Sequence, residues 1–335
     1  MSSIKDVARL AGVSTTTVSL VLNGKGNISE NTRQRVLSVV EQLGYTRNVR
    51  ARNLRDQQSR VIGYAQACWR SDYNPVLERF MHFLVRKLEQ QDRHVLLFTS
   101  QDDESTAAYD NLIGGQHVDG FVLSYTVMND ARFRFLHEAN VPFVAFGRSL
   151  SEMDDYVHWV DVDGHAGIYD ATKHLIEQGH ERIAVIAWDR GSASGQERLG
   201  GYIAAMAEAG IDHRPEYVIH QTNSIENGFR ATDSLMRLPE PPTAIVCISD
   251  TMAAGSLRWS AQNQTPIAVT GFDDDPVAEF THPSLTSVRQ PLEMVAERVT
   301  QMLIDQIEGR QSEPRTCLIA PSLIVRESSL IKSAT

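Results

Sequence analysis

Arginine, aspartate and aromatic residues directly follow several apolar runs in the long C-terminal part of this chain. Guanidinium and carboxylate groups hydrogen-bond to hydroxyl groups, and aromatic rings stack on C–H faces, so this combination suits a polyhydroxylated ligand. Because ligands of open α/β sheets bind beyond the carboxyl ends of the strands, we expect these side chains to line one cleft. For each residue the alternative is a solvated loop position or a structural salt bridge. The candidates are Trp69, Tyr73, Arg148, Ser192, Ser194, Arg198, Asn223, Asp250, Phe272 and Asp273.

Catalytic and metal-binding chemistry has no motif in the sequence. No G-x-S-x-G elbow, H-E-x-x-H pair, P-loop or G-x-G-x-x-G fingerprint occurs, and the eleven histidines are dispersed. The three consecutive carboxylates from Asp273 to Asp275 cannot all point at one ion. Cys68, Cys247 and Cys317 lie far apart and form neither a C-x-x-C pair nor a zinc-type cluster. We therefore predict reduced cysteines and a protein without enzymatic activity, cofactor or metal.

The composition is typical of a globular protein rather than a membrane protein. Hydrophobic residues make up 42% and charged residues 22% of the 335 residues, and no apolar run approaches the roughly 20 residues of a membrane span. Lys5, Asp6 and Arg9 interrupt the segment where a secretory signal needs an unbroken apolar stretch. We therefore expect a cytoplasmic protein without membrane contact, with about two to three domains.

The charge is distributed unevenly along the chain. The formal net charge is −10, which taken alone argues against a nucleic-acid partner. Residues 1–60, however, contain ten Lys or Arg and four Asp or Glu, a balance of +6, so the remaining residues carry −16. A basic segment at one end of an acidic chain is typical of phosphate binding by that segment.

Three short helices are predicted within residues 1–46. Apolar residues at helical spacing from Ile4 to Ala11 indicate the first helix, and Gly12 ends it with a tight turn that needs a positive φ. Ser14 is a good N-cap for a second helix to about Leu22, and Ser29 caps a third helix through Leu43. A helix, a glycine turn and a helix form the helix-turn-helix arrangement, and the alternative is a generic three-helix bundle.

The second helix is expected to have one apolar and one polar face. Its core side holds Val18 and Leu22, together with Val13 from the preceding turn. In the third helix we expect Val36, Val39 or Val40, and Leu43 to be buried. The outward face of the second helix then presents Thr15, Thr16, Ser19 and Leu20.

The first 48 residues resemble a known DNA-binding head. The run IKDVARLAGVSTTTVSLVLNG, followed by LGY at Leu43 to Tyr45, is strongly similar to the head of the lactose and galactose repressor (LacI/GalR) family. The resemblance implies that Thr15, Thr16, Ser19 and Leu20 lie on a recognition helix in the DNA major groove. It places Ser14, Thr17, Asn23, Ser29, Thr32 and Tyr45 near phosphates, and the DNA-binding set also includes Ile4, Lys5 and Asn27.

Leu20 departs from the family pattern, in which many members carry Arg at this position. Arginine is well suited to bidentate contact with guanine, whereas leucine offers an apolar surface to a thymine methyl group. We therefore expect a different base preference at this position.

Residues 47–60, RNVRARNLRDQQSR, have the composition of a linker. Composition alone favours a disordered tether. The resemblance instead implies a hinge helix that folds on DNA and pairs with its dimer mate in the minor groove. Leu54 then occupies the position of a leucine that wedges a base step apart, and Asn48, Ala51 and Arg55 join the DNA-binding set.

From residue 61 the chain alternates β-branched or aromatic runs with helical patterns, which is typical of a doubly wound parallel sheet. The pattern restarts near His165, so two similar lobes are predicted, about 61–160 plus 290–320 and about 161–289 plus 321–335. The family's regulatory body resembles a periplasmic sugar-binding protein with this organisation. The fold class expected is therefore α/β, with an all-α helix-turn-helix head.

The resemblance extends over the whole chain and predicts the function. It implies a homodimer that binds a near-palindromic double-stranded DNA operator and represses a carbohydrate-utilisation operon. A sugar or oligosaccharide effector bound between the lobes controls this binding, and Arg198 and Asp273 align with effector-binding positions of the family. Because the final residues lack a heptad repeat, a dimer is expected rather than a tetramer. The alternatives are a sugar-binding protein without a DNA role, a corepressor-dependent regulator and a sugar-metabolising enzyme with a Rossmann-like body.

Overall fold

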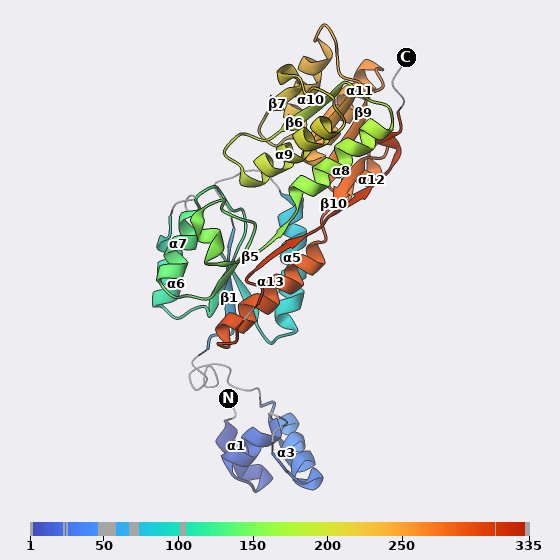
Figure 1. Ribbon diagram of the computed structural model, residues 1–335. Coiled ribbons are helices and arrows are strands. Elements are labelled where there is room, and N and C mark those ends of the chain that lie inside the picture. The colour runs from blue at the N-terminus through green and yellow to red at the C-terminus, as the bar shows by residue number, and fades with distance from the viewer. Residues whose placement is uncertain are drawn as a thin grey trace. The chain divides into compact units, whose positions relative to one another are not determined.

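The computed structural model describes residues 3–22, 24, 26–45, 58–66, 74–100, 105–311 and 313–331. The chain forms two compact units, the head (Met1–Gln58) and the body (Ser59–Thr335) (Figure 1). Most of the predicted linker, residues 47–57, lies outside the described residues. Among the helices of the described residues, none is both long enough and apolar enough to cross a membrane.

Three helices form the described part of the head, as predicted. They are α1 (Ile4–Ala11), α2 (Thr15–Leu22) and α3 (Glu30–Gln42). Ser3 and Asp6 cap the start of α1 reciprocally, each side chain bonding to the backbone N–H of the other. Gly12 ends α1 with φ at 62°, a left-handed conformation that glycine adopts without steric cost.

The core of the head consists of small apolar side chains from all three helices. Val18 and Val21 are the buried residues of α2, whereas the sequence analysis placed Leu22 beside Val18. Residues three apart share a helix face, so Val21 points into the core with Val18 and Leu22 is half-buried. The buried set is Val7, Ala8, Ala11, Val18, Val21, Val36 and Val39.

Two six-stranded sheets are present in the described part of the body, one in each lobe (Figure 1). The strand order is β11-β5-β4-β3-β1-β2 in lobe 1, where all pairs are parallel, and β12-β10-β9-β8-β6-β7 in lobe 2, where β12 is antiparallel to β10. Lobe 1 contains β1 (Val61–Gln66), β2 (His94–Thr99), β3 (Gly120–Leu123), β4 (Phe143–Phe146), β5 (His158–Val162) and β11 (Thr316–Ile319). Lobe 2 contains β6 (Ile183–Ala187), β7 (Val218–His220), β8 (Ala244–Cys247), β9 (Ala268–Asp273), β10 (Thr286–Arg289) and β12 (Ser322–Ile324).

Helices cover both sheets, as the alternating pattern predicted. In lobe 1, α5 and α13 pack against each other and against the apolar face of the sheet. The chain passes from one sheet to the other after β5, after β10 and after β11, so both lobes are built from separate segments. Lobe 1 has α5 (Pro75–Glu89), α6 (Ala107–Gly114), α7 (Ala131–Glu138), η1 (Glu152–Asp155) and α13 (Leu292–Ile307). Lobe 2 has α8 (Gly164–Glu177), α9 (Ala193–Glu208), η2 (Pro215–Tyr217), α10 (Ile225–Met236), α11 (Asp250–Asn263), α12 (Val277–Phe280) and η3 (Glu327–Ser329).

The alternating pattern did not indicate every element of the body. The strand β5 was not predicted, because its sequence HWVDV mixes polar and apolar residues instead of forming an apolar run. The segment near the C-terminus contributes two strands, β11 and β12, which lie in different sheets. Helix α9 begins at Ala193 and contains Gly195, Gly200 and Gly201, and glycine weakens the helical signal of a sequence.

One of those glycines has a packing role. Helices α8 and α9 lie side by side (Figure 1), and a Cβ atom at Gly201 would lie 2.1 Å from the backbone oxygen of His165 on α8. Gly201 therefore allows the two helix backbones to approach closely. This packing fixes the position of α9, which carries Arg198.

Candidate functional site

Helix α2, which the resemblance predicts to be the recognition helix, is capped by a serine. The Thr17 backbone N–H donates to Ser14 Oγ at 3.0 Å, and the two hydroxyl oxygens lie 2.9 Å apart. Thr15 and Thr16 are exposed on the first turn, as expected. Ser14 and Thr17 thus form hydrogen bonds with each other in the free protein. Thr15 and Thr16 instead present their hydroxyl groups to solvent.

Ser19 and Leu20 are half-buried, which differs from the outward position expected for them. A Cβ atom at Gly26 would lie 3.4 Å from Leu20 Cδ1, so the turn after α2 covers part of the leucine side chain. Leu20 therefore offers a partial apolar surface on α2 rather than a fully exposed side chain.

The second predicted phosphate-contact region lies at the start of α3. The Thr32 backbone N–H donates to Ser29 Oγ at 3.4 Å, so these two residues cap the helix as Ser14 and Thr17 do in α2. Asn27 and Lys5 are exposed, whereas Tyr45 packs partly against the core. Ile4 also packs against the core. The remaining predicted contacts Asn23, Asn48, Ala51, Leu54 and Arg55 lie outside the described residues, as do Trp69 and Tyr73 of the body.

In the body, the Arg198 guanidinium packs against two aromatic rings. Its central carbon is 3.7 Å from the centroid of the Phe272 ring and 4.8 Å from that of the Trp188 ring. Arg198 Nη1 donates to the Ile248 carbonyl at 2.7 Å and lies 3.6 Å from Asp273 Oδ1. Arg198 is only 7% exposed, so its position is fixed by stacking and by these bonds.

Asp273 ends β9 beside this guanidinium. Gln290, which directly follows β10, donates its Nε2–H to Asp273 Oδ1 at 2.7 Å. Burial raises the pKa of Asp273 well above its usual range, and the positive charge of Arg198 opposes that rise. The structure therefore brings together Arg198, Phe272 and Asp273, three of the side chains that the sequence predicted to line one cleft.

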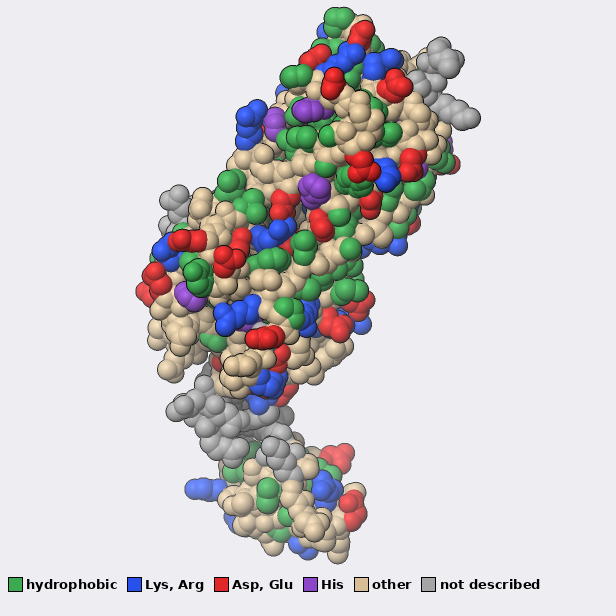
Figure 2. All heavy atoms as spheres, in the orientation of Figure 1, with side chains coloured by type: hydrophobic (Ala, Val, Ile, Leu, Met, Phe, Trp, Pro, Cys, Tyr) green, Lys and Arg blue, Asp and Glu red, His purple; other side chains and the backbone are tan. Residues whose placement is uncertain are grey.

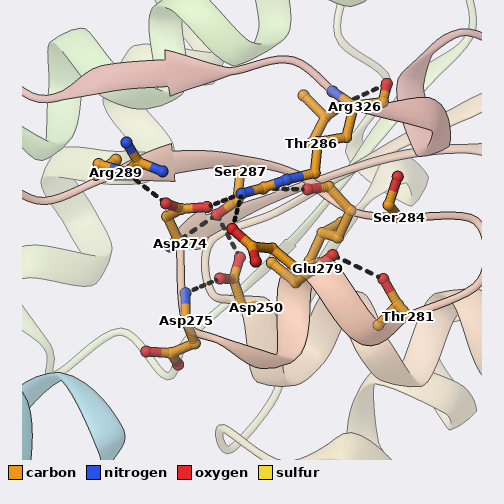
Figure 3. Close-up of polar contacts among 12 residues, drawn as sticks. Asp250, Asp274, Asp275, Glu279, Thr281, Ser284, Thr286, Ser287, Arg289 and Arg326 are labelled. Carbon is orange, nitrogen blue, oxygen red and sulfur yellow. Dashed lines mark hydrogen bonds and ion pairs between the residues drawn. The ribbon is translucent and has the colours of Figure 1, made fainter.

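Asp250 lies near this group, and both of its carboxylate oxygens accept hydrogen bonds. Ser287 donates to Asp250 Oδ1 at 2.5 Å, and the Asp275 backbone N–H donates to Oδ2 at 2.8 Å (Figure 3). Asp274 in turn pairs with Arg289 and Arg326 at 2.5 and 2.8 Å. Burial raises the pKa of Asp250 to about 7. Because Asp250 is fully buried and bonds to the segment after β9, we interpret it as a support for Asp273.

Arg148 joins the two lobes. It follows β4 of lobe 1 and donates from Nε to Asp161 on β5 at 3.0 Å and from Nη2 to Glu197 on α9 of lobe 2 at 2.7 Å. Its guanidinium carbon also lies 5.2 Å from the centroid of the Trp159 ring. Burial raises the pKa of Glu197 to about 6 and also raises that of Asp161, and Arg148 opposes both shifts. The sequence analysis gave a structural salt bridge as the alternative to a ligand contact at Arg148, and the structure contains such a salt bridge.

The other predicted body residues have structural bonds of their own. Ser192 Oγ accepts the Gly195 backbone N–H at 3.1 Å and caps α9. Asn223 Oδ1 accepts from Ser249 Oγ at 2.7 Å. Ser194 is half-buried within the first turn of α9. None of these three has a recorded polar contact with Arg198 or Asp273 within the described residues.

Several residues of this region were missed by the sequence analysis. Trp188 and Gln290 directly follow β6 and β10, so the rule that polar and aromatic residues after strands line the site could have found them. Asp161 belongs to the unpredicted strand β5, and Glu197 carries no sequence signal. We define the inter-lobe cluster as Arg148, Asp161, Trp188, Glu197, Arg198, Phe272, Asp273 and Gln290.

The inter-lobe cluster contains buried donors without an acceptor. Among the described residues, Arg198 Nε and Trp188 Nε1 are buried nitrogens with no hydrogen-bond partner. A buried N–H without an acceptor is costly, so such groups commonly meet a ligand or water. No group of three or more His, Cys, Asp or Glu within the described residues has the arrangement of a metal site.

Comparisons with known proteins match both parts of the chain. Residues 3–48 match the family described as bacterial regulatory proteins, lacI family, and residues 172–329 match a periplasmic binding protein-like domain. The HTH-type transcriptional regulator CelR of Thermobifida fusca is 33% identical over 336 residues, covering 97% of this chain and 98% of CelR. A solved LacI-family regulatory protein from Chloroflexus aggregans is 37% identical, with a TM-score of 0.76, and covers 81% of this chain and 98% of its own. A solved complex of CelR with cellobiose is 31% identical, with a TM-score of 0.75, and covers 98% of this chain and 100% of its own.

A helix-turn-helix head and a two-lobed body of this kind define a ligand-responsive class of transcription regulator. The chain belongs to the lacI family of bacterial regulatory proteins. The resemblance that the sequence of the head indicated is therefore confirmed, together with the predicted α/β fold class.

Proposed function

We propose that this regulator represses carbohydrate-utilisation genes and that a neutral sugar or oligosaccharide, bound at the inter-lobe cluster, controls its affinity for an operator. The observation that carries the proposal is the placement of Arg198 beside Asp273 and against the Trp188 and Phe272 rings. The half-buried Trp188 ring suits the C–H face of a sugar, and a charged pair suits its hydroxyl groups. The relative solved with cellobiose supports a sugar as the ligand class.

The charge of the inter-lobe cluster favours a neutral ligand. Its two guanidinium groups, Arg148 and Arg198, are already paired with the carboxylates of Asp161, Glu197 and Asp273. An anionic effector would bring another negative charge to three acids, whereas a neutral hydroxyl group can accept from Arg198 Nε or Trp188 Nε1. We therefore expect neutral sugars to bind more tightly than sugar acids or sugar phosphates.

Operator binding is assigned to the head and the linker. The exposed hydroxyl groups of Thr15 and Thr16 on α2 and the +6 balance of residues 1–60 support a recognition helix in the major groove. Residues 47–60 would act as a hinge, with Leu54 as the residue that enters the minor groove. In this proposal the effector changes the relation of the two lobes, which alters the hinge and hence operator affinity.

We also propose that the protein acts as a cytoplasmic homodimer without catalytic activity. Phe280 and Val277 on α12 are 83% and 45% exposed. They are three residues apart on one helix and so share a face, and exposed apolar side chains that adjoin on one face are candidates for an interface. Sedimentation of Phe280→Ser at micromolar concentration should show dissociation toward a monomer, and an unchanged dimer would exclude α12 from the interface.

The central proposal can be tested with purified full-length protein. A gel-shift experiment on a randomised palindromic duplex pool would identify the operator, and a thermal-shift screen of mono- and disaccharides, including cellobiose, would identify the effector. Glucuronate and glucose 6-phosphate provide anionic comparators. Adding the sugar to the operator complex then separates an inducer, which releases DNA, from a corepressor, which tightens binding. Absence of both sequence-specific binding and any sugar-dependent shift would overturn the proposal.

A further inference from the structure

One buried carboxylate binds the first residues of the body. Asp119 Oδ1 accepts the Ser59 backbone N–H at 2.6 Å and the Ser59 hydroxyl at 2.8 Å. Its other oxygen, Oδ2, accepts the Arg60 backbone N–H at 2.8 Å and Arg93 Nη1 at 2.7 Å. These four donors occupy all the acceptor positions of a single carboxylate. Two of them are consecutive backbone amides, so the bonds fix the direction of the chain itself.

Asp119 is firmly attached to the sheet of lobe 1. It directly precedes β3, and its backbone N–H donates to the Val61 carbonyl on β1 at 2.8 Å. Arg93 directly precedes β2, and the side chains of Arg93 and Asp119 are only 5% and 8% exposed. Breaking a buried pair leaves an uncompensated charge, so the pair is a rigid part of the lobe.

Arg60 receives two further contacts. Its carbonyl accepts the His94 backbone N–H at 2.9 Å, and its side chain forms an ion pair with Asp92. Its φ is 59°, a left-handed conformation that a residue with a side chain adopts only when its surroundings impose it. The path of the chain at Ser59 and Arg60 is therefore determined by residues around Asp119 that are distant in sequence.

We propose that Asp119 is the positioning residue that couples lobe 1 to the linker preceding Ser59. This inference rests on the proposed function, in which an effector in the body alters operator binding through residues 47–60. A change in lobe 1 can pass to the linker only through chain whose direction is fixed relative to the lobe. The Asp119 carboxylate provides that fixed direction at the first residues of the body.

The first test requires neither operator nor effector. Hydrogen exchange of the full-length protein, resolved at Ser59 and Arg60, is compared between wild type and Asp119→Asn. Loss of charge-assisted bonds should accelerate exchange at both amides by about tenfold or more. Asp110→Asn, which removes an exposed acid from α6 of the same lobe, should leave these amides unchanged. Unaltered exchange in Asp119→Asn would overturn the inference.

The second test measures coupling with cellobiose as the probe and the duplex selected by wild type as the operator. In Asp119→Asn, the ratio of operator affinities with and without cellobiose should fall by about threefold or more toward one. The cellobiose-induced rise in melting temperature should be retained, because the inter-lobe cluster is untouched. A merely structural role would lower stability without changing the ratio, and an unchanged ratio would therefore overturn the inference.

A milder variant covers the case in which Asp119→Asn does not fold. Ser59→Ala removes the 2.8 Å hydroxyl bond and leaves the Arg93–Asp119 pair intact, so the same changes are expected at smaller size. If wild type does not respond to cellobiose, that result counts against the sugar part of the proposed function. Hydrogen exchange at Ser59 and Arg60 still decides whether Asp119 holds them.

Discussion

The head and the body place their candidate binding residues in opposite environments. Thr15 and Thr16 of the head are exposed, and their side chains are free to meet a partner. In the body, Arg198 and Asp273 are buried, and each already bonds to another residue. The head therefore presents a ready surface, whereas a ligand of the body must exchange with contacts that also hold the fold together.

The two regions also differ in how their charges are balanced. On the face of the body visible in Figure 2, basic and acidic side chains are interspersed, and the inter-lobe cluster pairs each guanidinium with a carboxylate. The head and linker carry an excess of basic residues without matching acids. An unmatched excess suits long-range attraction to DNA, and matched buried charges suit selection of a small neutral ligand.

The largest expected effect comes from separating the two regions. Deleting residues 1–58 should leave a folded dimer that binds effector but has lost all specific affinity for DNA, because the basic excess and the recognition helix are removed together. Gel shift and thermal shift on the same preparation measure the two properties. Specific DNA binding by the truncated body would contradict the division of roles.

Substitution within the inter-lobe cluster should weaken effector binding much more than operator binding. Arg198→Ala and Asp273→Ala should each cost about 1.5 to 3 kcal/mol of effector binding, which is the usual contribution of a hydrogen bond to a charged group. This corresponds to roughly ten- to a hundredfold in affinity, measurable by calorimetry. Operator affinity without effector should change little, so both variants should bind DNA and fail to respond.

The exposed Arg190 lies before α9 and supplies a control for the loss of a positive charge. Arg190→Ala should retain normal effector binding. If Arg198→Ala and Asp273→Ala instead lose operator binding outright, these residues hold the lobes together and do not recognise the ligand.

The pair of Arg148 and Glu197, which joins the two lobes, should give the body a pH dependence between pH 4.5 and 6. The folded-state pKa of Glu197 is raised to about 6, so the folded protein retains a proton there that the unfolded chain loses near its ordinary value of 4.5. The stability contributed by this group is therefore fully present below pH 4.5 and is lost as pH rises through 6.

Glu197→Gln should remove this decrease, which amounts to about 1 to 2 kcal/mol after allowing for partial exposure. Urea unfolding of wild type and variant from pH 4.5 to 7.5 measures the difference. Parallel pH profiles would show that Glu197 does not titrate in this range.

The smallest effect is expected on the recognition helix. Leu20→Ala should reduce operator affinity by about 1 kcal/mol and relax the preference for thymine at one base pair, because an apolar contact with a methyl group is lost. Binding to duplexes that carry each base at that position measures the preference. Leu10→Ala removes an exposed leucine from α1 and serves as the matched control. A uniform loss across all four bases would assign Leu20 to packing of the head.

The sequence alone was sufficient for the three helices of the head and for the fold class of the body. Helix spacing, Gly12 and the caps Ser14 and Ser29 are local features, and local features determine short helices. The alternation of strands and helices likewise predicted a parallel sheet. Arg198 and Asp273 were predicted from their positions after apolar runs and from the family resemblance, and the fold places them 3.6 Å apart.

The bonding partner of each polar side chain depended on the tertiary structure. Asp250, Ser192, Asn223 and Asp273 look alike in the sequence, and the fold gives each of them a different partner. Glu197 lies 49 residues from Arg148, and no periodicity relates them. Hydrogen bonds and ion pairs act over a few ångströms, so only the packing of the lobes decides which distant residues meet.

The attachment of the linker to lobe 1 likewise depends on residues that are far apart in the sequence. Asp119 lies 60 residues from Ser59, and in the sequence it is one acid among 42. Its role becomes visible only when β1 and β3 pair and bring the start of the body beside it. Sequence patterns determine which elements form because their causes are local, whereas the bonds between elements depend on sheet register and lobe packing, which bring together residues far apart in the chain.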